Sequence, residues 1–166
     1  MAIVDIVKSC PIFFELYDDE IEKVLKDCKV HTYNDGDYIV KEGDKGKEIY
    51  IMLAGTAFMQ RKVGNKTVNI ETLKHSSVFG YFVLTEEQTY TSDIVASGSA
   101  DVLSIPYDHL LGFFRTNPGI VAVIALNLTR MMAQRMDALR ESIFEKTKAL
   151  ENVTDSIRRH KKVSGE

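Results

Sequence analysis

The stretch NDGDYIVKEGDKGKEIYIMLAG, residues 34–55, indicates a protein built mainly from short β-strands. Asn and Gly recur in it at Asn34, Gly36, Gly43 and Gly55, and these residues readily adopt the positive φ that tight turns require. Between the turns the side chains alternate with a period of two. Turn signals continue at short intervals as far as Gly98. Residues 30–106 therefore predict an antiparallel β-roll or double-stranded jelly roll, not a parallel α/β sheet.

Helices are expected on both sides of this β region. Within residues 1–29, the acidic run 18–20 places negative charge where a helix begins, and apolar residues follow from Ile21 with helical spacing. A short helix is expected over residues 107–116, with Asp108 as its cap. Asn117-Pro118 then opens a long helix that occupies residues 117–166 and ends in a basic tail.

The long helix carries an apolar seam. Its members recur in alternating steps of four and three residues, with Lys146 as the polar exception. They are Met132, Met136, Leu139, Ile143, Leu150, Val153 and Ile157. This is coiled-coil spacing, and about 40 helical residues extend roughly 60 Å, more than one small domain can cover. We therefore predict a homodimer that forms through this helix; the alternative is a helix that folds back on its own β domain.

Composition sets the broad class. The chain has 166 residues and a net charge of −3, which implies no general attraction to nucleic acid or to anionic membranes. Cys10 and Cys28 fit neither a metal pair nor a disulfide framework, so reduced thiols are expected. No secretory signal is present, and the longest uncharged stretch, residues 116–129, is too short to span a bilayer. The expected location is the cytoplasm.

Signatures of enzymes are missing from the sequence. There is no GxSxG elbow and no GxxxxGK[ST] phosphate loop. The histidines do not form an HxH or HExxH pair, as a metal site of the cupin type would require; they are His31, His75, His109 and His160. We expect no catalytic residues, no metal and no cofactor.

Several short motifs resemble the cyclic nucleotide-binding domain family, which includes the effector domains of catabolite-activator-type and FNR-type bacterial regulators. They are IFFxL at 12–16, GDxI at 36–39, EGD at 42–44 and FG at 79–80. The resemblance extends over about residues 10–140. It implies an antiparallel jelly roll with a ligand pocket inside, where a short helix presents backbone N–H groups to a cyclic phosphate.

The segment FGYFVLTEEQTYTSDIVA, residues 79–96, departs from that family's phosphate cassette. In ligand-binding members the cassette begins FGE and ends in Arg followed by a small residue. Here Tyr81 replaces the Glu and Tyr90 the Arg, and the segment has three acids but no Lys or Arg. Loss of the guanidinium costs about 2–4 kcal/mol, or roughly 30- to 1000-fold in affinity. The candidate pocket residues are Phe79, Gly80, Tyr81, Phe82, Val83, Leu84, Tyr90, Thr91 and Arg135.

The departure leaves alternatives open. Tyr81, Phe82 and Tyr90 either offer stacking faces and hydroxyls to another small molecule or simply fill the pocket. Arg135, on an ungapped count from Asn117, either supplies the missing positive charge to a cyclic nucleotide or is a solvated helix charge. His75 is either a lone axial ligand for haem, which the wider regulator family includes, or a histidine in a surface turn.

The end of the chain bears on its output. Regulators of this family continue into a helix-turn-helix domain, whereas the residues after Phe144 continue the helix. Arg158, Arg159, Lys161 and Lys162 either complement the helix dipole or form a nucleic-acid tail. We therefore expect a non-enzymatic signalling module without a DNA-binding domain, with a possible protein partner. The alternatives are a scaffolding dimer with an empty pocket and the effector half of a transcription regulator.

Overall fold

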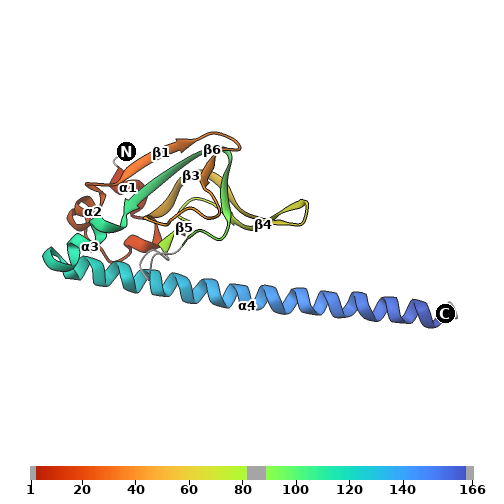
Figure 1. The fold of residues 1–166 in the computed structure, drawn as a ribbon. Coiled ribbons are helices and arrows are strands. Elements are labelled where there is room, and N and C mark those ends of the chain that lie inside the picture. The colour runs from red at the N-terminus through yellow and green to blue at the C-terminus, as the bar shows by residue number, and fades with distance from the viewer. Residues whose placement is uncertain (1–2, 82–88, 164–166) are drawn as a thin grey trace. The chain divides into compact units, whose positions relative to one another are not determined.

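The computed structural model describes residues 3–81 and 89–163, and it divides the chain into two compact units, Met1–Leu128 and Thr129–Glu166 (Figure 1). The first unit contains one β-sheet and the shorter helices. The helical elements are α1 (Ile3–Val7), the 3-10 helix η1 (Pro11–Phe13), α2 (Asp18–Leu25), α3 (Tyr107–Thr116) and α4 (Pro118–Val163). Among the described residues, no helix is both long and apolar enough to cross a bilayer.

The sheet is antiparallel throughout. Its strands are β1 (Lys29–Tyr33), β2 (Tyr38–Val40), β3 (Glu48–Val63), β4 (Lys66–Leu73), β5 (Val78–Phe79) and β6 (Asp93–Pro106). The order is β1-β6-β3-β4, while β2 also pairs with β6 and β5 with β3. The structure thus confirms the predicted antiparallel β-roll with N-terminal helices and a long C-terminal helix.

The long pair of β3 and β6 changes register twice, on either side of Ala54. Gly55 lies in the second irregularity with φ 78°. A Cβ on this residue would overlap the carbonyl oxygen of Ser99 and lie 2.8 Å from the Cα of Ala100. Only glycine fits here, and such irregularities bend and twist a sheet, which helps it to curl into a roll.

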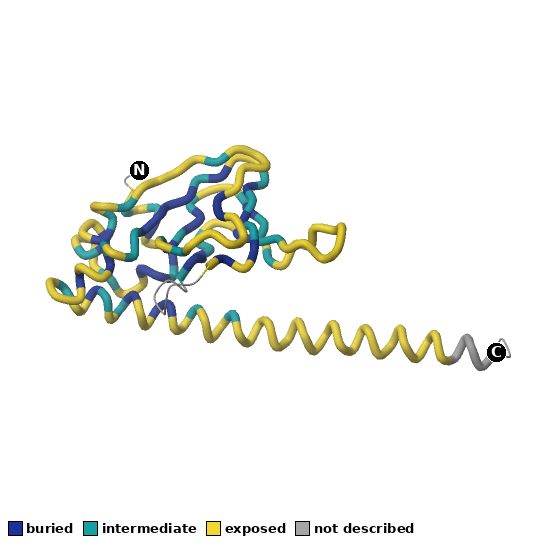
Figure 2. Tube along the Cα trace, viewed as in Figure 1, coloured by how far each residue is buried: buried dark blue, intermediate teal, exposed yellow. Residues whose placement is uncertain are grey.

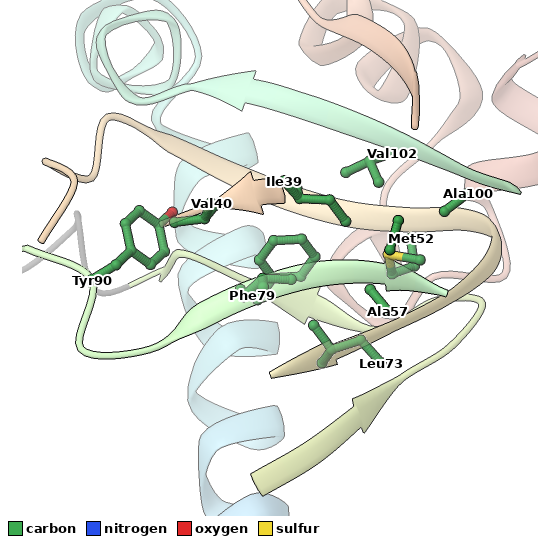
Figure 3. Packing of buried hydrophobic residues seen from close by; sticks show 11 residues of the cluster. Ile39, Val40, Met52, Ala57, Leu73, Phe79, Tyr90, Ala100 and Val102 are labelled. Carbon is green, nitrogen blue, oxygen red and sulfur yellow. The ribbon is translucent and has the colours of Figure 1, made fainter. Parts of the chain in front are cut away.

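Apolar side chains from both ends of the β region form one core cluster, shown in Figure 3 with Tyr90 at one end of the view and Ala100 at the other. The cluster consists of Ile39, Val40, Met52, Ala57, Leu73, Phe79, Tyr90, Ile94, Ala96, Ala100 and Val102. Phe79 and Tyr90, at the two ends of the suspected phosphate cassette, are therefore part of the core. Figure 2 shows buried residues on the strands of this unit and also on its helices.

The helix starts show one agreement and one error. The acidic run lies in the first turn of α2, where the carboxylate of Glu20 accepts the backbone N–H of Tyr17 at 2.9 Å. The expectation that Asp108 caps α3 was wrong, because this helix already begins at Tyr107 and Pro106 occupies the capping position. Pro106 is the last residue of β6 and has extended backbone angles, so the chain turns directly from strand to helix.

Asn127 ties the beginning of α4 to the N-terminal segment of the first unit. Its side chain is 2% exposed, and its amide nitrogen donates to the carbonyls of Ile12 at 3.2 Å and Phe14 at 2.6 Å. Ile120 and Leu128 are buried on the same part of the helix. Up to Leu128, α4 therefore packs on its own domain.

We expect Asn127→Ala to lower the free energy of unfolding by about 2–3 kcal/mol, because it leaves the buried carbonyl of Ile12 and the partly buried carbonyl of Phe14 without their donor. Urea denaturation measures this change. Asn152→Ala is the matched control: Asn152 is exposed on the same helix, so the change in helix propensity is the same. Equal effects of the two substitutions would show that the Asn127 amide is not an anchor.

The second unit is a helical segment whose apolar residues are exposed. The seam side chains are 50–67% exposed in the single chain (Figure 2). Along it, hydroxyls of Thr147, Thr154 and Ser156 donate to carbonyls four residues earlier, and Arg140 pairs with Asp137 at 3.0 Å. The coiled-coil dimer stays a prediction. Such a dimer requires an exposed apolar stripe, and the seam has one.

Candidate functional site

The beginning of the cassette is fixed by β5 and its neighbour β3. Phe79 is 2% exposed, and its ring stacks on that of Tyr50 with 5.2 Å between centroids and 16° between planes. Gly80 follows with φ 77°. A Cβ on Gly80 would lie 2.6 Å from both the carbonyl oxygen of Glu48 and the hydroxyl oxygen of Tyr90. The backbone at Gly80 is thus closely covered by neighbouring oxygens.

The end of the cassette is fixed by the EGD turn. The backbone N–H of Tyr90 donates to the carbonyl of Asp44 at 2.9 Å, and its carbonyl accepts the N–H of Gly43 at 2.7 Å. The Tyr90 side chain is 7% exposed and belongs to the core cluster (Figure 3). The residue in place of the family's Arg is therefore a buried aromatic ring whose hydroxyl reaches Gly80.

A carboxylate dominates the electrostatics around these rings. The hydroxyl of Tyr50 donates to Oε2 of Glu48 at 2.9 Å. Burial, followed by the charge of Glu48, raises the pKa of Tyr50 and of Tyr90 above the ordinary range, and the same two causes raise the pKa of Tyr33. These phenols stay protonated and neutral at physiological pH. The described part of the site therefore has hydroxyl donors and a negative charge beside Gly80.

The structure brings only some of the predicted pocket residues together. Phe79, Gly80 and Tyr90 meet in the first unit, and Tyr81 follows them, partly buried. Thr91 is exposed, whereas the next residue, Ser92, is buried.

The remaining predicted pocket residues are not tested. Phe82, Val83 and Leu84 lie outside the described residues. Arg135 is half-buried and belongs to the second unit, so its proposed role in the pocket stays a prediction. Among the acids of the cassette, Asp93 serves the local backbone, because its carboxylate accepts the N–H of Glu42 at 2.8 Å and so stabilises the EGD turn.

Glu48 and Tyr50 were missed by the sequence reasoning. Both lie on β3, and Tyr50 is directly opposite Phe79 in the sheet. The sequence showed a strand with alternating side chains just after the EGD turn. It did not show the strand register that places Tyr50 opposite Phe79. Knowledge of this pairing would have pointed to Glu48 as a further source of negative charge.

His75 has a bracing role in its turn. Nδ1 lies 2.7 Å from the carbonyl oxygen of Leu53, and Nε2 lies 3.3 Å from the hydroxyl oxygen of Ser9. Because both ring nitrogens contact protein oxygens, this arrangement favours the surface-turn interpretation over haem ligation. Among the residues that the structure describes, no group of three or more His, Cys, Asp or Glu could hold a metal ion.

Both cysteines are free thiols. Cys10 is buried, and its sulfur lies 3.5 Å from the hydroxyl oxygen of Ser76. Burial raises the pKa of Cys10, and burial together with nearby Asp27 and Glu48 raises that of Cys28 to about 12. The two thiols are therefore protonated at neutral pH and poor nucleophiles.

The chain is 26% identical to the cyclic AMP receptor protein of Thermus thermophilus over 140 residues, which are 84% of this chain and 62% of that protein. It spans less than two thirds of the length of the first sequence relatives that it matches.

Solved structures show the same fold. A cyclic nucleotide-binding domain from Methylobacillus flagellatus superposes with a TM-score of 0.76 at 18% identity, covering 87% of this chain and 82% of that one. The sensor domain of the transcriptional regulator DNR from Pseudomonas aeruginosa gives a TM-score of 0.64 at 15% identity, covering 80% and 90%.

The sequence profile of the cyclic nucleotide-binding domain matches residues 30–117, more than half of the chain. The match includes the strands of the roll, the EGD turn and the positions of Gly80 and Tyr90. On this evidence the chain belongs to the cyclic nucleotide-binding domain family.

Proposed function

We propose that this chain is a non-enzymatic, cytoplasmic regulatory domain that does not hold cAMP or cGMP in the manner the family cassette implies. The observation that carries the proposal is the position of Tyr90. Where the resemblance implies a guanidinium for the phosphate, a phenol ring lies in the core and reaches the Gly80 backbone.

Three costs oppose a cyclic phosphate here. The charge-assisted contact of the missing Arg is worth about 2–4 kcal/mol. Displacing the buried Tyr90 ring from the core costs roughly a further 1.5–3 kcal/mol. The carboxylate of Glu48, which already accepts the hydroxyl of Tyr50, adds repulsion against an anion. Together the first two terms alone weaken binding by about 300-fold or more.

The regulatory role rests on family membership and on the two-part architecture. We infer that the chain forms a homodimer through the seam of α4, and that a state change in the β-roll alters the geometry of that dimer. A ligand drives such a change only through a difference in its affinity for the two states. This mechanism needs no catalytic group, and it applies equally if the chain is the effector half of a longer regulator.

Titration calorimetry with cAMP and cGMP tests the proposal. We expect dissociation constants no tighter than about 1 mM, which corresponds to roughly −4 kcal/mol. The Thermus thermophilus relative named cyclic AMP receptor protein provides a comparison under identical conditions. A micromolar constant for this chain would overturn the proposal, and loss of that affinity in Arg135→Ala would then establish the altered binding mode.

A scaffolding dimer is the second candidate. The packing of Phe79 and Tyr90 in the core cluster favours it, because the side chains themselves fill one end of the roll. Native mass spectrometry of the purified protein separates the two candidates. A small molecule that co-purifies in stoichiometric amount supports a refitted sensor, whereas an unliganded dimer that does not respond to any nucleotide supports the scaffold.

A further inference from the structure

A pocket lies between α2 and α3, on residues that the cassette does not use. Its volume is about 380 Å³, within the range of roughly 300–1,000 Å³ typical of small-molecule sites. Both helices belong to the first unit and lie side by side at one end of it (Figure 1). Lys23, Lys26 and Asp27 line the pocket from α2 and the residues just after it, and His109, Gly112 and Phe113 line it from α3.

The walls of this pocket are held together by His109. Its Nε2 lies 2.9 Å from the carbonyl oxygen of Val24, and its Nδ1 lies 2.9 Å from Oδ2 of Asp27. The ring also packs edge-on against Phe113 with 5.0 Å between centroids. Since these contacts join the two helices directly, the pocket is formed before any ligand arrives.

The charge of the lining is mainly positive. Both ring nitrogens of His109 face oxygen atoms, and one of these belongs to the carboxylate of Asp27. Lys23 pairs with Asp19 at 2.9 Å. Lys26 is exposed, and among residues 3–81 and 89–163 its ammonium has no carboxylate partner. The ammonium group of Lys26 is therefore the charged group of this lining that is available to bind an anionic ligand.

The floor of the pocket is apolar and open. Phe113 is 8% exposed, so its ring is largely packed. A Cβ built on Gly112 would meet no atom within 4 Å, apart from its own helix backbone and chain neighbours. The absence of a side chain at Gly112 therefore leaves room beside an aromatic ring, next to a basic rim.

We propose that this pocket binds a small amphiphilic carboxylate. Its carboxylate pairs with Lys26, and its apolar body lies over Gly112 and against Phe113. A ligand with one negative charge matches the ammonium of Lys26. Its apolar tail covers the exposed part of Phe113 and so buries apolar surface. The site is independent of the nucleotide cassette, because none of its lining residues belongs to residues 79–96.

The pocket is connected to the start of α4, the helix proposed to form the dimer, through the end of α3. The carbonyl of Phe113 accepts the N–H of Asn117, the residue directly before α4. A ligand that packs on Phe113 therefore contacts the last turns of α3, from which the long helix departs. The pocket is positioned to act as an effector site of its own.

The test uses amide NMR shifts with three probes of one shape: 3-phenylpropionate, 3-phenylpropylamine and 3-phenylpropanol. We expect 3-phenylpropionate to move the amides of α2 and α3 in a saturable way, the alcohol to bind at least about tenfold more weakly, and the amine not to bind. Lys26→Gln should weaken 3-phenylpropionate by about tenfold, whereas Lys66→Gln, on the distant β3–β4 hairpin, should not.

Filling the floor gives a second, charge-neutral test. Gly112→Leu should abolish binding of 3-phenylpropionate, and Gly112→Ala, which also favours the helix, should weaken it several-fold with the fold intact. Equal binding of the amine, unchanged binding to both Gly112 variants, or shifts centred on Gly80 and Tyr90 would overturn the proposal. So would binding of an acidic peptide at α2 and α3 without binding of 3-phenylpropionate.

Discussion

Ile143→Asp should convert the protein from a dimer into a monomer at micromolar concentration. Ile143 is 64% exposed in the single chain and lies in the middle of the seam, with Leu139 and Leu150 as its apolar neighbours along the stripe. In a twofold coiled coil the substitution acts on both helices. Each copy loses about 1.5–3 kcal/mol of burial and brings a carboxylate into the interface. A loss of about 4 kcal/mol corresponds to roughly 1000-fold in the dissociation constant.

Light scattering coupled to size exclusion measures this change, and far-UV circular dichroism reports whether the first unit stays folded. Phe144→Asp is the matched control. Phe144 is 60% exposed and one residue further on, so it lies about 100° away around the helix and outside the seam. A wild-type protein that is monomeric at micromolar concentration, or equal effects of the two substitutions, would refute dimerisation through this stripe.

The double substitution Tyr81→Glu with Tyr90→Arg should create cAMP binding that the natural sequence lacks. It restores the two cassette residues that the family resemblance implies for the ribose hydroxyl and the phosphate. The guanidinium also replaces a buried ring, which opens space above Gly80. We expect a gain of about 30- to 1000-fold in affinity, or roughly 2–4 kcal/mol. Titration calorimetry on the wild type and the double variant gives the comparison.

Two further variants sharpen this experiment. Tyr90→Phe keeps the ring and removes the hydroxyl, so it should bind cAMP no better than the wild type does. Glu48→Gln, added to the double variant, should strengthen binding further, because the carboxylate otherwise competes with the phosphate for the new guanidinium. The proposal fails if Tyr90→Phe binds as well as the double variant, or if wild type already binds in the micromolar range.

Much of the fold could be predicted because local signals agreed with one another. Turn glycines such as Gly36 and Gly43 mark strand ends, and the structure gives both positive φ. The acidic run in the first turn of α2 and the Asn-Pro pair at the start of α4 mark where these helices begin. The error at Asp108 arose because Asp is favoured both as the capping residue of a helix and within its first turn. Only the extended backbone angles of Pro106 show that Asp108 lies in the first turn.

The site was less predictable because it depends on pairing between distant strands. The substitutions at Tyr81 and Tyr90 were visible in the sequence, and so was their lack of positive charge. The position of Glu48 and Tyr50 beside Phe79 and Gly80 depends on the register of β3 against β5, which no local pattern encodes. The pocket beside Gly112 likewise depends on how α3 lies against α2, since a glycine within a helix gives no sign in the sequence of the space around it.

The way in which residue 90 is anchored has a consequence for how such domains diversify. Both of its hydrogen bonds to the EGD turn come from the peptide backbone, one from the N–H and one to the carbonyl. Any side chain without an unusual backbone requirement can make these bonds. The side chain at position 90 can therefore change by substitution of one residue while these two backbone hydrogen bonds are kept. One fold can in this way acquire or lose affinity for a class of ligand without a change in its backbone contacts to the EGD turn.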